Sequence, residues 1–121
     1  MKEVIPPNQV QLLGNIGQEV ELRELNTGKK VARVSLATNE YKQTNNGAPE
    51  KVTTWHNLVA WGNIAEEMST TLQKGQKIMV EGKIQYRNYE TKTGEKRYST
   101  EILVQSFKKI NKEDAASVTQ S

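Results

Sequence analysis

Hydrophobic and polar residues alternate along most of this chain, and a period of two predicts β-strands. Val10 and Leu12 begin the first alternating stretch, and Ala32, Val34 and Leu36 line one side of another. Later stretches repeat the pattern or are rich in β-branched and aromatic residues. Strands are therefore expected at residues 9–17, 30–39, 52–61, 77–86 and 98–107, with a weaker candidate at 19–25.

One segment departs from this pattern. Between residues 63 and 75 the apolar residues Ile64, Met68 and Leu72 recur every four positions, which is typical of an amphipathic helix. Asn63 is expected to cap the start of this helix, and Gly75 to end it.

This order of elements predicts an all-β protein, a five-stranded Greek-key OB-fold barrel with one helix between strands 3 and 4. Gly14 and Gly82 stand where a small barrel needs bends. Such barrels bind oligonucleotides or oligosaccharides on the outer face of strands 2 and 3 and in the flanking loops. We expect the barrel domain to span residues 1–110. Residues 111–121 show no periodicity, so they are expected to form a short disordered tail.

Composition narrows the chemistry. With 121 residues the chain has the length of one domain, and it holds no cysteine, which excludes disulfides, Cys-ligated zinc and thiol nucleophiles. No run approaches the roughly 20 apolar residues of a membrane span, and the N-terminus lacks the apolar core of a secretory signal. We therefore expect a cytoplasmic protein that does not contact a membrane.

The charge is distributed unevenly. The formal net charge is +3, but residues 74–112 carry 10 basic and 4 acidic side chains, hence +6, whereas residues 1–73 carry 7 and 8, hence −1. A positive C-terminal third favours an anionic partner. Taken alone, a charge excess of this size is more often a solvated face.

The stretch "TTWHNLVAWG", residues 53–62, holds both tryptophans and the single histidine. In a strand, Trp55, Asn57 and Trp61 share one face, and His56 and Leu58 share the other. The tryptophans would lie about 20 Å apart at roughly 3.3 Å per residue, which suits two separate stacking platforms. Core burial is the alternative, since tryptophan is highly buried on average. A polar Asn57 beside them favours exposure.

Further aromatics stand among basic residues. Tyr86 and Tyr89 flank Arg87, and Tyr41 ends the second strand. Bases stack on aromatic rings at about 1–3 kcal/mol each while cations follow the phosphates. A single tyrosine is more often an ordinary strand residue. The two tryptophans and these tyrosines together favour single-stranded nucleic acid as the ligand.

His56 lacks the partners that a catalytic or metal-binding histidine needs. The sequence holds no second histidine and no cysteine to complete a metal site. Nothing around His56 indicates a nucleophile with an orienting acid, and no phosphate-binding loop motif occurs. We predict no enzyme activity, no cofactor and no metal, and a packed or subunit-interface role for His56.

Several segments, taken together, resemble a known family. These segments are "VQLLGNIG", "GKKVARVSLATNE", "WHNLVAWGNIAE", "LQKGQKIMVEGKIQYRNYE" and "GEKRYSTEI". In order and spacing, from about Val10 to Ile110, they resemble the bacterial and mitochondrial single-stranded DNA-binding protein (SSB) family. The resemblance implies an OB-fold homotetramer that binds single-stranded DNA without sequence preference. It also implies a nucleoid-associated role in DNA replication, recombination and repair.

The resemblance also implies roles for individual residues. Trp55, Trp61 and Tyr89 fall where the family stacks bases, and Tyr41 lies within one residue of a fourth such position. His56 falls at an intersubunit contact. With Tyr86 added from the aromatic pattern, these residues complete the expected stacking set. Lys74, Arg87 and Arg97 match basic positions of the family near the DNA path. The other residues that we expect to contact phosphates are Arg33, Lys77, Lys83 and Lys96.

Two departures from the family pattern matter. Positions that are basic in well-known members are here Gln9, Asn57, Asn63, Gln85 and Asn88, so we expect a shallower salt dependence. Typical bacterial members also carry a long tail with an acidic tip that recruits replication and repair proteins. Residues 111–121 contain no such tip, so the sequence assigns no recruitment.

Three other interpretations make different predictions. A dimeric, primosome-type OB-fold accessory protein would act through protein contacts, and the retained stacking aromatics argue against it. An oligosaccharide-binding OB domain would need no basic excess, and its binding would not depend on salt. A hydrolase built on His56 would lose turnover in His56→Ala.

Overall fold

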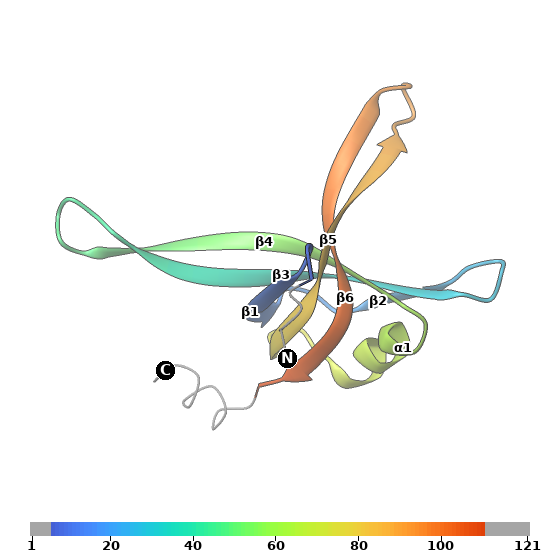
Figure 1. Ribbon diagram of the computed structural model, residues 1–121, viewed down its shortest axis with the longest axis horizontal. Helices are drawn as coiled ribbons and strands as arrows, with labels where there is room; N and C mark the ends of the chain where they lie inside the picture. The colour runs from blue at the N-terminus through green and yellow to red at the C-terminus, as the bar shows by residue number, and fades with distance from the viewer. Residues whose placement is uncertain (1–5, 111–121) are drawn as a thin grey trace.

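The computed structural model describes residues 6–110 and contains six β-strands and one α-helix (Figure 1). The elements are β1 (Val10–Ile16), β2 (Glu21–Glu24), β3 (Lys30–Gln43), β4 (Pro49–Trp61), α1 (Gly62–Thr71), β5 (Lys77–Glu90) and β6 (Lys96–Lys109). Every strand and the helix expected from the pattern are present. The expected tail, 111–121, lies outside the described residues.

Five of the strands close into a barrel. The strand order is β1-β5-β6-β4-β3-β2, and β1 also pairs with β3, which joins the two sides of the sheet. Neighbouring strands are antiparallel except β4 and β6, which run parallel where Asn57 to Val59 pair with Glu101 to Leu103. The predicted all-β barrel with a single helix is confirmed.

The weak strand candidate at 19–25 forms β2, which changes the strand count. Ile16 of β1 lies opposite Leu36 and Glu21 of β2 lies opposite Arg33, so β1 and β2 follow one another along β3. The chain between them, residues 17–20, interrupts the edge. α1 therefore follows the fourth strand of the chain, although it lies between the third and fourth strands of the closed barrel.

The hydrophobic core fills the barrel, and burying each large apolar side chain contributes about 1.5–3 kcal/mol. α1 contacts β3 and β4 and adds Ala65 and Met68 to this core. The largest fully buried side chains are Ile16, Leu36, Leu58, Val59, Met68, Ile78 and Val80.

The helix differs from its expected bounds at both ends. The predicted cap at Asn63 is wrong, because β4 passes directly into α1 and Trp61, in extended conformation, is the N-cap residue. Trp61 makes no side-chain capping hydrogen bond. The helix ends at Thr71, four residues before Gly75, which instead forms a turn with a φ of 89°. Within residues 6–110, no helix is long and apolar enough to span a membrane.

Gly82 marks a bend in β5, as expected. A β-bulge shifts the register of β5 and β6 between Glu81 and Gly82. A Cβ atom at position 82 would lie 2.1 Å from the Leu103 carbonyl oxygen, so only glycine allows β6 to come this close.

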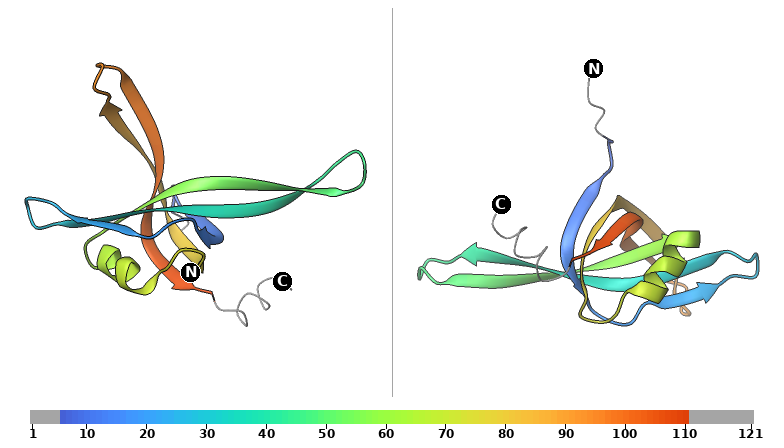
Figure 2. Two further views of the ribbon diagram at one scale, coloured as in Figure 1. Left: turned by 180° about the vertical axis from the view of Figure 1, so that it is seen from behind. Right: turned by 90° about the horizontal axis from the view of Figure 1, so that it is seen from below.

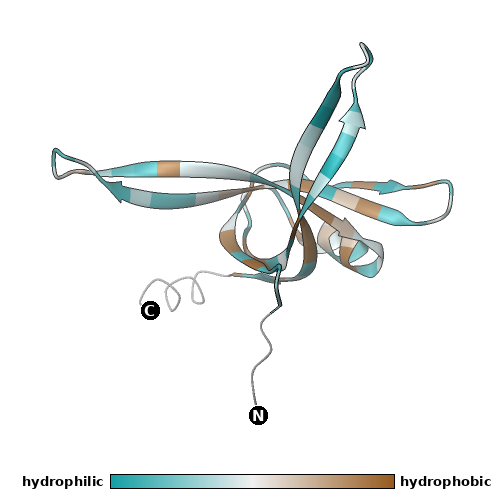
Figure 3. Cartoon of the chain, turned by 45° about the horizontal axis from the view of Figure 1, so that its top comes forward, coloured by the Kyte–Doolittle hydropathy of each residue, from teal (hydrophilic) through white to brown (hydrophobic). Residues whose placement is uncertain are grey.

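Two long hairpins extend beyond the barrel (Figures 1 and 2). We call them the β3–β4 arm, residues 38–54, and the β5–β6 arm, residues 86–100. Within each arm the two strands pair only with each other, because β1 pairs with β3 only at residues 36 and 37 and β4 pairs with β6 only from residue 57 on. Figure 3 shows mostly hydrophilic residues along both arms, hydrophobic ones mainly in the barrel, and both kinds along α1.

Candidate nucleic-acid interface

The strand register places one row of aromatic and charged residues on the outside of β3, β4, β6 and β5. Trp55 pairs with Ala37 across β3, Asn57 pairs with Glu101 across β6, and Tyr89 pairs with Arg97. Alternation then assigns the remaining residues to the same side. We call this surface the aromatic face; it consists of Arg33, Tyr41, Trp55, Asn57, Trp61, Arg87, Tyr89, Arg97 and Glu101.

Trp55 lies against the interruption between β1 and β2. A Cβ atom at Gly17 would be 2.3 Å from Cζ3 of the Trp55 indole, so the ring packs directly on the glycine backbone. The Gly17 N–H donates to the Ser35 carbonyl, which fixes this backbone to β3. Trp55 nevertheless stays 61% exposed. It is therefore a supported ring with a large free surface.

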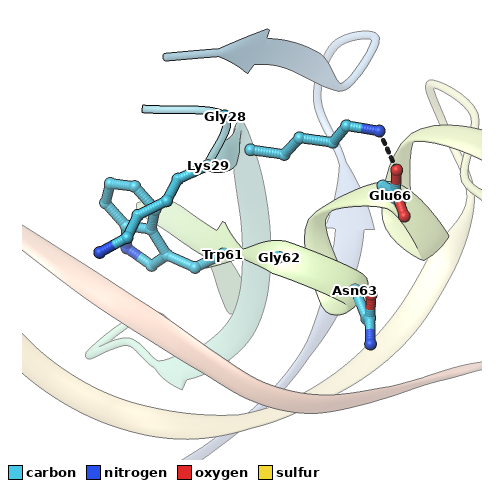
Figure 4. A pocket seen from close by; sticks show the side chains of 7 residues that line it. Gly28, Lys29, Trp61, Gly62, Asn63 and Glu66 are labelled. Carbon is cyan, nitrogen blue, oxygen red and sulfur yellow. Dashed lines mark hydrogen bonds and ion pairs between the residues drawn. The ribbon is translucent and has the colours of Figure 1, made fainter. Parts of the chain in front are cut away.

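Trp61 lines a cavity of about 540 Å³ between the β2–β3 turn and the start of α1. Figure 4 shows its indole and Lys29 on one side of this cavity, with Asn63 and Glu66 of α1 on the other. Lys30 forms an ion pair with Glu66, and the hydrogen bond and charge of this carboxylate raise the pKa of Lys30 above its usual value. The Lys29 ammonium and the Trp61 indole face the same cavity, so one ligand there can contact both.

The expected exposure of both tryptophans is confirmed, since Trp61 is 42% exposed and Trp55 more so. Val59 lies on the same side of β4 but is buried. It sits where β4 is flanked by β3 and β6 together, opposite Arg33 and Leu103. The tryptophans lie on either side of this covered junction.

Two of the expected stacking tyrosines lie on the aromatic face. Tyr89 is partly exposed on the β5–β6 arm, opposite Arg97. Tyr41 is highly exposed on the β3–β4 arm, opposite Lys51. The face therefore carries aromatic rings on both arms and beside the barrel.

Tyr86 lies on the other side of the β5–β6 arm from Tyr89, at the base of the arm, where it lines one cavity with Arg87 and Trp61. The two residues are three positions apart, and an odd spacing places side chains on opposite faces of a strand. Tyr98 shares this reverse side and is 73% exposed, although it lies on the same side of β6 as the buried Ile102. Beyond the barrel the inward side of the strand meets solvent, which sequence alternation alone does not reveal.

The predicted phosphate contacts divide into separate groups. Arg87 and Arg97 lie on the aromatic face, and the Arg97 guanidinium is 3.0 Å from Glu95. Lys83 points to the same side, four residues before Arg87, whereas Lys96 lies on the reverse side opposite Glu90. Arg33 is on the face but its Nη1 donates to Oε2 of the buried Glu101 at 2.7 Å.

The remaining two lysines lie near the start of β5. The turn that contains Lys74 is held to β1 by two backbone hydrogen bonds, Gly75 N–H to Ile16 and Ile16 N–H to Gln76. Lys74 is therefore next to Gly75, which is hydrogen-bonded to Ile16, the chain neighbour of the Gly17 that supports Trp55. Lys77 pairs with Asn15, ten residues and about 33 Å along β5 from Arg87, so it is not part of the same cluster.

His56 lies on the side of β4 opposite the tryptophans, as expected. Its Nε2 is 2.9 Å from the Thr38 hydroxyl, and both residues line a cavity of about 350 Å³ with Leu12 and Leu13. Among the residues that line this cavity, Glu40 is the one carboxylate and His56 the one histidine. Across residues 6–110, no group of three His, Asp or Glu side chains could hold a metal ion.

This geometry coincides with a match to a known family. The chain matches the Single-strand binding protein family over residues 7–110. It belongs to this family. The resemblance of the sequence segments is thereby confirmed.

Two curated relatives cover most of the chain. "Single-stranded DNA-binding protein 1" of Chlorobaculum tepidum is 36% identical over 113 residues, which is 93% of this chain and 70% of that protein. "Single-stranded DNA-binding protein 1" of Xylella fastidiosa is 38% identical over 106 residues, 87% of this chain and 78% of that protein.

Solved structures share the fold. The Plasmodium falciparum SSB complex with ssDNA superposes with a TM-score of 0.80 at 31% identity and covers 92% of this chain and 100% of that one. A deletion mutant of the Thermus aquaticus single-stranded DNA-binding protein gives a TM-score of 0.76 at 25% identity, over 87% of this chain and 51% of that one.

Proposed function

We propose that this protein binds single-stranded DNA by stacking bases on Trp55, Trp61 and Tyr89 while Arg87 and Arg97 hold phosphates. One observation carries the proposal: three partly exposed rings and two arginines share one continuous face of the sheet. Family membership supports the ligand, and the Plasmodium falciparum relative was solved with ssDNA.

Stacking explains why binding needs no particular sequence. Every base has a π-face, and each base stacked on an aromatic ring contributes about 1–3 kcal/mol. The face lies on both arms, so one DNA strand can run from Tyr41 past the tryptophans to Tyr89. Proteins of this family bind DNA without catalysis, which confirms the prediction that the protein is not an enzyme. Binding protects single-stranded DNA during replication, recombination and repair.

We also propose that the protein assembles as a homotetramer and acts in the cytoplasm at the nucleoid. Val52 and Met79, two exposed apolar residues, and the partly exposed His56 lie outside the aromatic face. Family membership supports the assembly, and contacts through these residues would leave the aromatic face free for DNA. Sedimentation velocity on the free protein measures the assembly directly: a tetramer is expected, and a monomer would contradict it.

Alanine variants test the stacking roles. Trp55→Ala and Trp61→Ala are each expected to weaken binding to a poly-thymidine strand roughly tenfold, since each removes one stacked base. Equilibrium titration measures the loss. Tyr98→Ala is the control, because Tyr98 is an exposed ring on the reverse side of the β5–β6 arm, and its affinity is expected to stay within about twofold of the parent protein. Unchanged affinity in both tryptophan variants would contradict the proposal.

A further inference from the structure

Glu101 is the one buried charged residue among residues 6–110, and it lies in the middle of the aromatic face. Its side chain is 4% exposed. It stands on β6 where the two arms meet, opposite Asn57 of β4 and Gln85 of β5. A carboxylate at the centre of a surface that binds phosphates requires a physical reason.

The carboxylate has two arginine neighbours from different strands. Its Oε2 accepts a hydrogen bond from Nη1 of Arg33 at 2.7 Å, and Nη1 of Arg87 lies 3.9 Å from the same oxygen. The first distance is that of a charge-assisted hydrogen bond, and the second is too long for one. A buried carboxylate without a paired cation is strongly unfavourable, so Arg33 is held beside Glu101.

The three side chains also separate two hollows of the aromatic face. A cavity of about 490 Å³ extends from Arg33, Arg87 and Glu101 to Trp61. A second, of about 530 Å³, extends from the same three residues to Tyr89. The cluster therefore lies between two of the rings to which the proposed function assigns bases.

We propose that Glu101 is a positioning residue that retains Arg33 as its counter-ion and leaves Arg87 as the cation that contacts phosphate at this junction. The inference rests on the proposed function, and it replaces the expectation that Arg33 binds phosphate. Arg33 and Glu101 together carry no net charge, so Arg33 does not attract a DNA phosphate. Arg87, at the longer distance, is free to turn toward the DNA.

The salt dependence of binding distinguishes this role from a purely structural one. For single strands, each phosphate neutralised by a protein cation adds about 0.7 to the slope of log affinity against log salt concentration. Glu101→Gln keeps the size and an acceptor oxygen but releases the charge of Arg33. We expect the slope to steepen by about 0.7 and affinity at low salt to rise.

The double variant Arg33→Gln with Glu101→Gln is the matched control, since it removes both charges and leaves none buried and unpaired. Its slope is expected to equal that of the unsubstituted protein. A double variant shallower by about 0.7 would show that Arg33 already contacts phosphate and would overturn the proposal. So would an unchanged slope in folded Glu101→Gln. If that single variant does not fold, the double variant alone decides. Tryptophan quenching of the unsubstituted protein in the same titrations tests the proposed function separately.

Discussion

Trp55 takes its position from a residue that the hydrophobic pattern does not indicate. Alternation along β4 correctly predicts the side on which Trp55, Asn57 and Trp61 lie, because strand geometry fixes it. The contact with Gly17 brings together residues 38 positions apart, and no local pattern encodes it. The same holds for Arg33 and Glu101, which are 68 positions apart. The alternation of residues along a strand therefore predicts which side chains are exposed, but it does not predict which distant residues hold them in place.

Gly17→Ala is expected to weaken DNA binding through Trp55. The added Cβ atom would overlap the indole at 2.3 Å and the Ser35 hydroxyl at 2.8 Å, so the ring must move from its support. We expect a loss of about 1 kcal/mol, the lower end of one stacked base, in an equilibrium titration. In a Trp55→Ala background the same change should cost almost nothing. Equal losses in both backgrounds would show that Gly17 acts through the fold instead.

The arms show where prediction of elements succeeds and where it stops. The alternating segments correctly predict the central residues of every strand, and the spacing of Ile64, Met68 and Leu72 correctly predicts the helix. The polar segments 42–51 and 90–97 are typical of turns, yet β3 continues to Gln43 and β4 begins at Pro49. Backbone hydrogen bonds extend both hairpins without any hydrophobic pattern. Consequently the reverse side of the β5–β6 arm, with Tyr86 and Tyr98, is exposed where alternation suggests core.

The two sides of the β5–β6 arm are expected to differ in function. Tyr89→Ala removes a ring from the aromatic face and should weaken binding to poly-thymidine roughly tenfold. Tyr98→Ala, an exposed ring on the reverse side opposite Asn88, is the matched control and should change affinity less than about threefold. Equilibrium titration of both variants measures this difference. Equal losses would mean that DNA contacts both sides of the arm.

Across the whole molecule, charge is modest for a protein that binds a polyanion. The net charge is +3, and the basic excess lies in residues 74–112, which include the β5–β6 arm. One cation of the aromatic face, Arg33, is paired internally with Glu101. Polar residues also stand where better-known family members carry basic ones. Stacking is therefore expected to supply a larger share of the affinity than phosphate contacts, and the salt dependence should be shallow.

A lysine added to the aromatic side should restore salt dependence. Asn63 lines the Trp61 cavity, so Asn63→Lys is expected to steepen the slope of log affinity against log salt by about 0.7. Thr70→Lys adds the same charge on an exposed residue near the C-terminal end of α1, which lines none of the cavities beside Trp61, Tyr89 or Glu101. Its slope should not change. Titrations at several salt concentrations compare the two, and equal steepening would mean that total charge controls binding.

The central claim is that bases stack on Trp55 and Trp61, and tryptophan fluorescence tests it most directly because these are the two tryptophans of the chain. The measurement is a titration with a long poly-thymidine strand at low and at high salt. We expect strong quenching that saturates at a fixed ratio of nucleotides to protein and that persists at high salt. No quenching in a folded protein would contradict the claim and would favour an accessory role through protein contacts.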